Sequence, residues 1–160
     1  MVGAVCEDQD QMVLVTSAGQ SIRFNVSDIR TMGRTAGGVK GITLKGEDSV
    51  VGTGVVQPNQ SDLQLLVVTE NGYGKRTPLE EYKIQGRGGS GIKTLNVTDK
   101  TGFIIGSKVV SGETEIIAMS RNSQVIRTSL ESVSVLGRAT QGVRLMKLRD
   151  KDSVASFTLI

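Results

Sequence analysis

The sequence predicts an all-β fold with about three copies of one propeller-like blade, each made of four antiparallel strands. The first observation is a Gly-Arg pair that begins at Gly33, Gly86 and Gly137, positions that lie 53 and 51 residues apart. A period near fifty residues is typical of propeller blades, in which one supersecondary unit repeats. The second observation is that short β-branched and aliphatic runs alternate with Gly- and Asn-rich turns, with no long helical pattern between them.

A second landmark supports this register. Arg23, Arg76 and Arg127 are also 53 and 51 residues apart, and two landmarks that share one register argue against a chance periodicity. The length of 160 residues is sufficient to bury a core as a single domain. We therefore interpret the chain as one domain, residues 1–160, with repeats at approximately 1–49, 50–102 and 103–160.

Each repeat is expected to supply an apolar strand and then a hairpin. The expected first strands are residues 50–56 and 103–110, with partial versions at 2–6 and 154–160. The expected second strands are residues 12–16, 65–69 and 116–119, followed by turns at 17–19, 70–72 and 121–123. Asn71-Gly72 is the clearest of these turns, because both residue types tolerate a positive φ.

The third strand of each repeat carries the arginine of the second landmark, and a short acidic or helical turn follows it. These turns are expected at residues 27–29, 78–82 and 130–132. The Gly-Arg loop comes next and leads into the fourth strand, expected at residues 40–44, 92–97 and 143–148. Four short strands in about fifty residues match the size of a propeller blade.

The Gly-Arg loops place cations at the same point of every repeat. Each pair stands five residues before a glycine, which an aliphatic residue and a second cation follow. A row of such loops can present charge to a long polyanion, with arginines forking onto phosphate oxygens. The candidate phosphate contacts are Arg23, Arg34, Lys40, Lys75, Arg76, Arg87, Lys93, Arg127, Arg138 and Arg144. The alternative is that these arginines pair with carboxylates of a neighbouring blade.

Composition restricts the chemistry. The chain has no histidine and only one cysteine, Cys6, which excludes a His-dependent triad, a zinc site and an internal disulfide. Its net charge is +3, and aromatic residues make up 3% of it, too few for base-stacking platforms. Duplex phosphates bound without base readout are the expected partner. No apolar run is long enough for a membrane span and no signal peptide is recognisable, so we expect a cytoplasmic protein.

The segment from Gly86 to Gly91 resembles a phosphate-binding loop only in part. Two glycines are separated by four residues, but Ile92 stands where the nucleotide-binding motif requires lysine. No helix is expected to follow, so the dipole that would hold a triphosphate is absent. We therefore expect no nucleotide, no cofactor and no small-molecule substrate.

Several stretches resemble the C-terminal domain of bacterial DNA gyrase A. The similarity is clearest from Thr69 to Thr77 (TENGYGKRT) and from Gln85 to Gly91 (QGRGGSG), and the other two Gly-Arg loops resemble further blades of that domain. The similarity covers essentially all of the chain. It implies a β-pinwheel, a propeller-like disc of usually six four-stranded blades, of which this chain holds about half. It also implies that duplex DNA bends around a basic rim, so that the enzyme introduces negative supercoils.

The resemblance implies further properties. Catalytic groups would lie elsewhere, because the strand-cleaving tyrosine of the family belongs to the N-terminal part. Partners would be that N-terminal domain and gyrase B, in a heterotetramer in the bacterial cytoplasm at the nucleoid. The family's Gln-Arg-Arg-Gly-Gly-x-Gly box has Gly86 in place of its first arginine here, so we interpret residues 85–91 as a degenerate copy. Two alternatives remain, the paralogous topoisomerase IV domain and a propeller that serves as a protein–protein scaffold.

Overall fold

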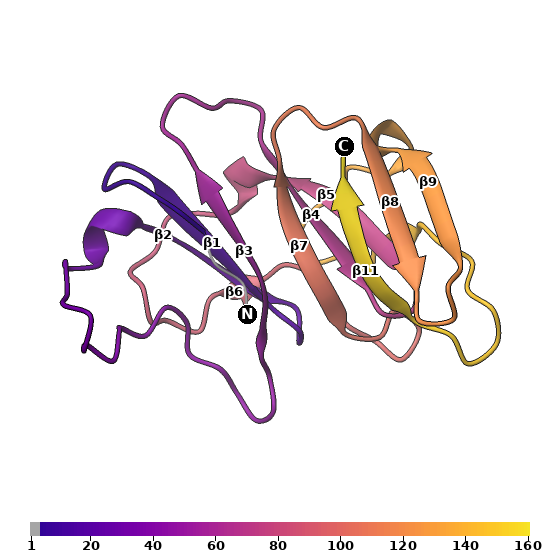
Figure 1. The fold of residues 1–160 in the computed structure, drawn as a ribbon, viewed down its shortest axis with the longest axis horizontal. Helices are drawn as coiled ribbons and strands as arrows, with labels where there is room; N and C mark the ends of the chain where they lie inside the picture. The colour runs from indigo at the N-terminus through magenta and orange to yellow at the C-terminus, as the bar shows by residue number, and fades with distance from the viewer. Residues whose placement is uncertain (1–3) are drawn as a thin grey trace.

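The computed structural model describes residues 4–160, and over this range it consists of strands, loops and three short 3-10 helices (Figure 1). The strands are β1 (Gln11–Thr16), β2 (Gln20–Asn25), β3 (Val50–Val56), β4 (Gln64–Thr69), β5 (Tyr73–Pro78), β6 (Ile92–Lys93), β7 (Ile104–Val110), β8 (Glu115–Ser120), β9 (Val125–Ser129), β10 (Val143–Arg144) and β11 (Val154–Leu159). The 3-10 helices are η1 (Val26–Asp28), η2 (Leu79–Glu81) and η3 (Leu130–Ser132). The predicted all-β fold is confirmed, and each 3-10 helix lies at a turn that the sequence predicted. Of the expected strand at residues 2–6, residues 2 and 3 lie outside the described residues, and residues 4–6 belong to no strand.

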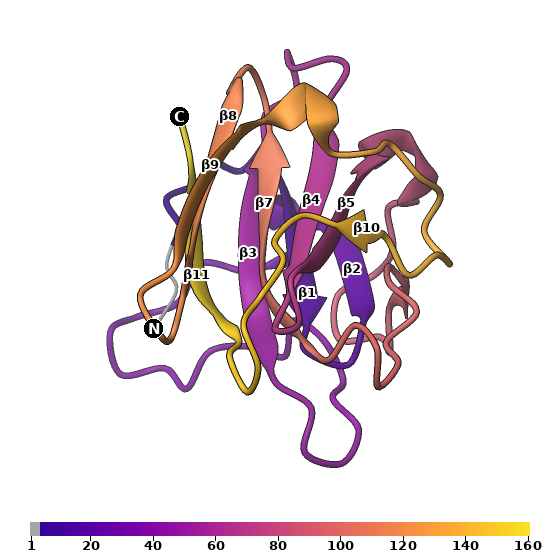
Figure 2. The same cartoon turned by 90° about the vertical axis from the view of Figure 1, so that its right-hand side faces the viewer.

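The strands form three antiparallel sheets that lie side by side (Figure 1). Their strand orders are β3-β1-β2-β6, β10-β5-β4-β7 and β11-β8-β9. In each sheet a central hairpin is flanked on one edge by an inner strand, and β3, β7 and β11 are these inner strands. The outer strands β6 and β10 occupy the opposite edge, and Figure 2 shows β10 and β2 on the side away from β11.

Two of the sheets have the four antiparallel strands that the sequence predicts, but their strands do not all come from one repeat. The strands after the second and third Gly-Arg loops pair with the preceding sheet: Ile92 lies opposite Ser21 in β2, and Val143 lies opposite Gly74 in β5. The expected strand at residues 40–44 is not formed, and the third sheet has three strands. Both differences follow from this pairing with the preceding repeat. Residues 4–160 contain no earlier hairpin with which residues 40–44 could pair. They also contain no later Gly-Arg loop whose strand could pair with β9.

The outer strands are also shorter than expected. Strands β6 and β10 each end after two paired residues. The next two residues then donate their N–H groups to a single carbonyl oxygen in the turn of the preceding hairpin. The N–H groups of Thr94 and Leu95 donate to the Gly19 oxygen, and those of Leu145 and Met146 donate to the Gly72 oxygen. Hydrogen bonding is therefore maintained while the regular ladder ends.

The core consists of apolar layers between neighbouring sheets. Strand β4 is buried on both faces, as its continuous apolar run predicts. Leu65 and Val67 pack with the first sheet, while Leu66 and Val68 pack with the third. On the far side of the first sheet, a smaller cluster joins Ile22 and Phe24 to Ile42, a buried residue just after the first Gly-Arg loop.

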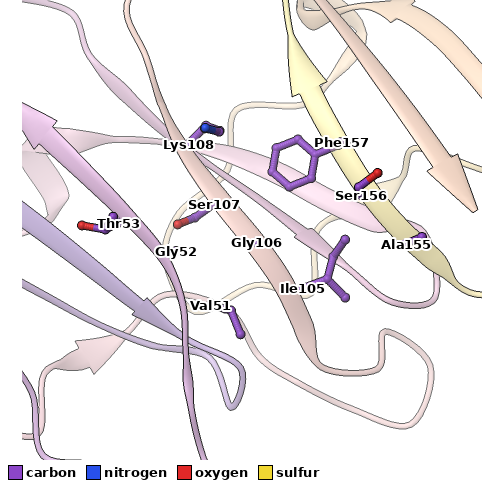
Figure 3. Close-up of a pocket in the computed structure, with 10 residues that line it drawn as sticks. All are labelled: Val51, Gly52, Thr53, Ile105, Gly106, Ser107, Lys108, Ala155, Ser156 and Phe157. Atoms are coloured by element: carbon purple, nitrogen blue, oxygen red, sulfur yellow. The ribbon is translucent and has the colours of Figure 1, made fainter. Parts of the chain in front are cut away.

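Glycines let the inner strands approach one another closely. A Cβ added at Gly52 of β3 would overlap the Ser107 side chain of β7, and one at Gly54 would lie 2.5 Å from the Val109 side chain. An open pocket of about 210 Å³ lies where β3, β7 and β11 meet. Figure 3 shows Phe157 of β11 beside Gly106 of β7 in this pocket. The inner edge of the sheets is therefore formed by close backbone packing.

Candidate nucleic-acid interface

The three Gly-Arg loops share one backbone feature, a left-handed glycine five residues after the glycine of the Gly-Arg pair. The φ angle of this glycine is +80° at Gly38, +71° at Gly91 and +78° at Gly142. Angles in this left-handed region favour glycine. A Cβ added at Gly91 would overlap the carbonyl oxygen of Ser21, and one at Gly142 would lie 2.6 Å from that of Gly74. The second and third loops are thereby fixed against the hairpin of the preceding sheet, and their cations take equivalent positions.

The arginines of the second and third pairs connect successive loops. The Arg87 guanidinium donates to the Lys40 carbonyl oxygen at 3.3 Å and to that of Asp28 at 3.0 Å. The Arg138 guanidinium donates to the equivalent carbonyl oxygen of Lys93, at 3.2 Å.

Arg138 also lies 4.0 Å from a carboxylate oxygen of Glu81, the kind of pairing that the sequence left open as an alternative. Arg34, the first of the series, is exposed and forms no hydrogen bond or ion pair with any residue from 4 to 160.

Two of the arginines of the second landmark, Arg23 and Arg76, donate hydrogen bonds to the main chain of the next repeat. Arg23 donates from Nη1 to the carbonyl oxygens of Leu79 (2.9 Å), the first residue of η2, and of Tyr82 (3.2 Å), the residue after it. Arg76 donates from Nε to the carbonyl oxygen of Val133, just after η3. Arg127 differs, because its side chain is 64% exposed and pairs with Glu115 of the adjacent strand.

Lys75 is enclosed, although the sequence offered it as a phosphate contact. Its side chain is fully buried, and Nζ donates to the carbonyl oxygens of Gly137 and Arg138 and to the hydroxyl of Thr140. These acceptors all belong to the third Gly-Arg loop. Lys75 thus anchors that loop to the second sheet, and its ammonium cannot reach a phosphate in this conformation.

Burial lowers the pKa of Lys75 to about 8; Glu81 acts in the opposite direction, and Arg138 lowers this pKa further. An unfolded lysine titrates near 10.5, so between about pH 8 and 10.5 the unfolded chain binds more protons than the folded one. Over this range we expect the free energy of unfolding to rise with pH, by at most about 1.4 kcal/mol per pH unit. Urea unfolding of the wild type and Lys75→Met at several pH values would measure it, with the rise present only in the wild type. Equal pH profiles for the two proteins would contradict this prediction.

Three of the predicted phosphate contacts remain accessible near the outer edge. Lys40, Lys93 and Arg144, the second cation of each loop, are all exposed. Arg144 donates to the Tyr73 hydroxyl at 2.9 Å, and its guanidinium lies 5.5 Å from the centre of that ring. Lys100 lies 5.3 Å from the same ring centre.

Lys147 joins these groups around a shallow groove that Asn71 and Asp152 also line. Sequence reasoning missed Lys100 and Lys147, because neither belongs to the repeated Gly-Arg motif. The available signal was Tyr73, an aromatic residue on a hairpin beside several cations.

The described residues lack two other kinds of site. Within residues 4–160, no three His, Cys, Asp or Glu side chains are grouped so that they could hold a metal ion. None of the helices in that range is both long and apolar enough to cross a membrane.

Comparisons with known proteins identify the family. A family model described as DNA gyrase C-terminal domain, beta-propeller, matches residues 10–57, 64–111 and 114–160. The DNA gyrase A protein of Kosmotoga olearia is 42% identical over 158 residues, which cover 99% of this chain but only 19% of that relative. The solved C-terminal domain of DNA topoisomerase IV aligns with a TM-score of 0.87 at 23% identity, over 96% of this chain and 47% of that one.

A solved DNA gyrase A C-terminal domain aligns with a TM-score of 0.58 at 23% identity, over 96% of this chain and 66% of that one. At such identities the two structural likenesses show the fold alone. The resemblance noted in the sequence is confirmed by the family match, which extends through all three repeats. The chain belongs to the family of DNA gyrase C-terminal β-propeller domains.

Proposed function

We propose that this domain binds duplex DNA through phosphate contacts on its outer edge, without reading base sequence. The observation that carries the proposal is the equivalent, exposed placement of Lys40, Lys93 and Arg144. Arg34, Lys100 and Lys147 extend this positive surface. Lys75, Arg23 and Arg76 instead connect repeats, since each donates to main-chain oxygens of the following one. Phosphate contacts of this kind position a duplex and carry no sequence information.

The relatives suggest the larger role. The chain covers about a fifth of the DNA gyrase A protein from Kosmotoga olearia (19%), so that protein's activity is part of the proposal. In this proposal the domain bends duplex DNA for an ATP-dependent type II topoisomerase that introduces negative supercoils. It carries no catalytic group itself and works with the N-terminal domain of gyrase A and with gyrase B in the bacterial cytoplasm. The 42% identity to a gyrase protein favours gyrase over topoisomerase IV.

The test is a salt titration of binding to random-sequence duplex DNA, followed by fluorescence anisotropy. Wild-type affinity should fall steeply with salt, since each neutralised phosphate releases counterions. Replacing Lys40, Lys93 and Arg144 together with alanine should weaken binding and flatten the slope of log affinity against log salt by about three units. A matched control replaces Lys108, Arg121 and Arg149, three exposed cations outside the Gly-Arg loops, and should change the slope less.

Two outcomes would contradict the proposal. One is equal slopes for the two triple variants, and the other is no binding at micromolar protein and low salt. The second result, combined with salt-sensitive capture of an acidic protein, would favour the scaffold alternative. Arg138→Ala should behave differently from the outer cations, lowering the melting temperature because its guanidinium connects two loops.

A further inference from the structure

The boundary between the second and third sheets has the same strand pairing as the boundary between the first and second. At the first boundary Lys93 of β6 lies opposite Gln20 of β2, and at the second Arg144 of β10 lies opposite Tyr73 of β5. Figure 2 shows β10 along the edge of the sheet that contains β5. Both boundaries have a sheet on either side, so they can be compared directly.

The residues around these pairs differ in charge between the two boundaries. By the repeat spacings of 53 and 51 residues, Lys100 and Lys147 at the second boundary take the places of Glu47 and Asn96 at the first. At the first boundary the charges of Lys93 and Glu47 therefore cancel. At the second boundary the equivalent places are all cationic or neutral.

Positive charge is in excess in the groove at the second boundary. Three cations line it, Lys100, Arg144 and Lys147, together with one carboxylate, that of Asp152. Both oxygens of this carboxylate accept hydrogen bonds from the β8–β9 hairpin. Neither of the ion pairs found among residues 4–160 joins it to the three cations. The groove therefore keeps a net attraction for anions.

Tyr73 orders two of these cations. Arg144 donates to its hydroxyl at 2.9 Å, and the Arg144 guanidinium and the Lys100 ammonium lie 5.5 Å and 5.3 Å from its ring centre. Cations at such distances are attracted to an aromatic ring. The ring itself is only 7% exposed, so it cannot serve as a platform for stacking a base. Its contribution to the groove is to hold the two cations in place.

The main chain that carries the cations is held as well. The Asn71 side chain donates to the Lys100 carbonyl oxygen at 3.3 Å, and that of Gln124 donates to the Lys147 carbonyl oxygen at 2.9 Å. Among residues 4–160, the Arg144 guanidinium donates only to Tyr73, and the two ammonium groups donate to no protein atom. Their remaining donors are free for a ligand, and little conformational entropy is left to lose on binding.

The shape of the groove indicates the class of ligand. Sites for small molecules enclose most of the ligand surface. This groove is shallow, and its three cations are exposed. It therefore suits an anionic group that is presented on the surface of a larger polyanion, such as the backbone of a duplex.

We propose that this groove is a preorganised site for phosphodiester groups of duplex DNA, in which Tyr73 positions Arg144 and Lys100. The site rests on the proposed function, since it assigns part of that binding to particular residues. It also makes the outer edge uneven, because the duplex is held more tightly here than at the boundary where Lys93 is the equivalent cation. Tyr73 is a positioning residue, which contacts the cations and not the phosphate.

Lysine acetylation followed by mass spectrometry tests whether DNA occupies the groove. Random-sequence duplex should slow acetylation of Lys100 and Lys147 severalfold and should not protect Lys108, an exposed lysine of the inner strand β7. Inorganic phosphate at about 1 mM, a concentration that reveals a Kd of that order, should protect none of them. Protection by phosphate alone would assign the groove to a free anion. Unprotected groove lysines on a protein saturated with duplex would show that the groove is empty. Either result would overturn the proposal.

Single substitutions test the difference between the two boundaries, with affinity measured by anisotropy. Arg144→Ala should weaken duplex binding about tenfold, as expected for one hydrogen bond to a charged group, and Lys93→Ala should weaken it less. Lys100→Gln and Lys147→Gln should each weaken it more than Lys108→Gln. Circular dichroism shows whether each variant is folded. Equal losses for Arg144→Ala and Lys93→Ala would overturn the proposal.

Tyr73→Phe tests the positioning role, because it keeps the buried ring and removes only the hydroxyl. It should weaken duplex binding about threefold, the effect of one ordinary hydrogen bond. The slope against salt should stay the same, since Arg144 keeps its charge. In the Arg144→Ala background the same change should have no effect. Equal losses in the two backgrounds would mean that Tyr73 does not act through Arg144, and its positioning role would be rejected.

The same measurements separate this site from the proposed function. A wild type that binds duplex with a steep salt dependence, while Lys100→Gln and Lys147→Gln behave like Lys108→Gln, keeps the function and overturns the site. A wild type that binds no duplex at micromolar protein and low salt contradicts both.

Discussion

Gly91→Val should lower the free energy of unfolding by about 3 kcal/mol or more, from left-handed strain of about 1–2 kcal/mol plus overpacking of about 1–3 kcal/mol. Gly91 has φ +71°, and its added Cβ would overlap the carbonyl oxygen of Ser21, which is main chain and cannot rotate away. The substitution therefore disrupts the pairing of β6 with β2. Urea unfolding, with the midpoint and slope fitted separately, measures the loss.

Gly38→Val is the matched control. Gly38 has nearly the same left-handed φ, +80°, but an added Cβ would have no neighbour within 4 Å. Gly38→Val should therefore lower the free energy of unfolding only by the conformational strain of about 1–2 kcal/mol. Equal losses for the two variants would show that close approach of the loop to the preceding hairpin adds nothing to stability.

Lys75→Ala should be the second large loss, about 3 kcal/mol, because it leaves buried acceptors unpaired and opens a cavity. The carbonyl oxygens of Gly137 and Arg138 lose their donor, and the third Gly-Arg loop loses its anchor. We expect a lower midpoint in urea and faster hydrogen exchange in residues 137–142. Exchange followed by mass spectrometry would locate the effect.

Lys75→Met separates the two causes. Methionine keeps most of the volume but offers no donor, so the difference between the alanine and methionine variants reports the cavity. The equivalent position holds isoleucine in the other repeats, at Ile22 and Ile126. A methionine variant as stable as the wild type would mean that the three hydrogen bonds only offset the cost of burying the ammonium, as happens for some buried charges.

Local pattern was sufficient to predict most strands. The alternation and length of the apolar runs placed β3 at its observed bounds and β1, β4 and β8 within one residue at each end. The repeat spacing also placed the loops of Gly86 and Gly137 at equivalent positions. These features depend on residues close in sequence, which a single chain displays directly.

The exchange of strands between repeats was not predictable in this way. A repeat spacing gives the length of the unit but not which repeat accepts its last strand, because that depends on contacts far apart in sequence. The roles of the cations were hidden for the same reason. Arg34 and Arg87 share one motif, yet only Arg87 has a preceding loop to bind within the described residues. Lys75 could have been recognised, since isoleucine at both equivalent positions marks the site as interior.

The exchanged strands also set the order in which the chain can fold. Ser21 can bond to Ile92, and Tyr73 to Arg144, only after the later residue of each pair has been synthesised. The two partners are 71 residues apart in both pairs. During synthesis, each hairpin therefore leaves the ribosome with an open edge and gains its last strand only when much of the next repeat has emerged. Such distant pairings slow folding and expose intermediates to aggregation. They also prevent one sheet from unfolding without loosening the next, which makes the array more cooperative than independent blades would be.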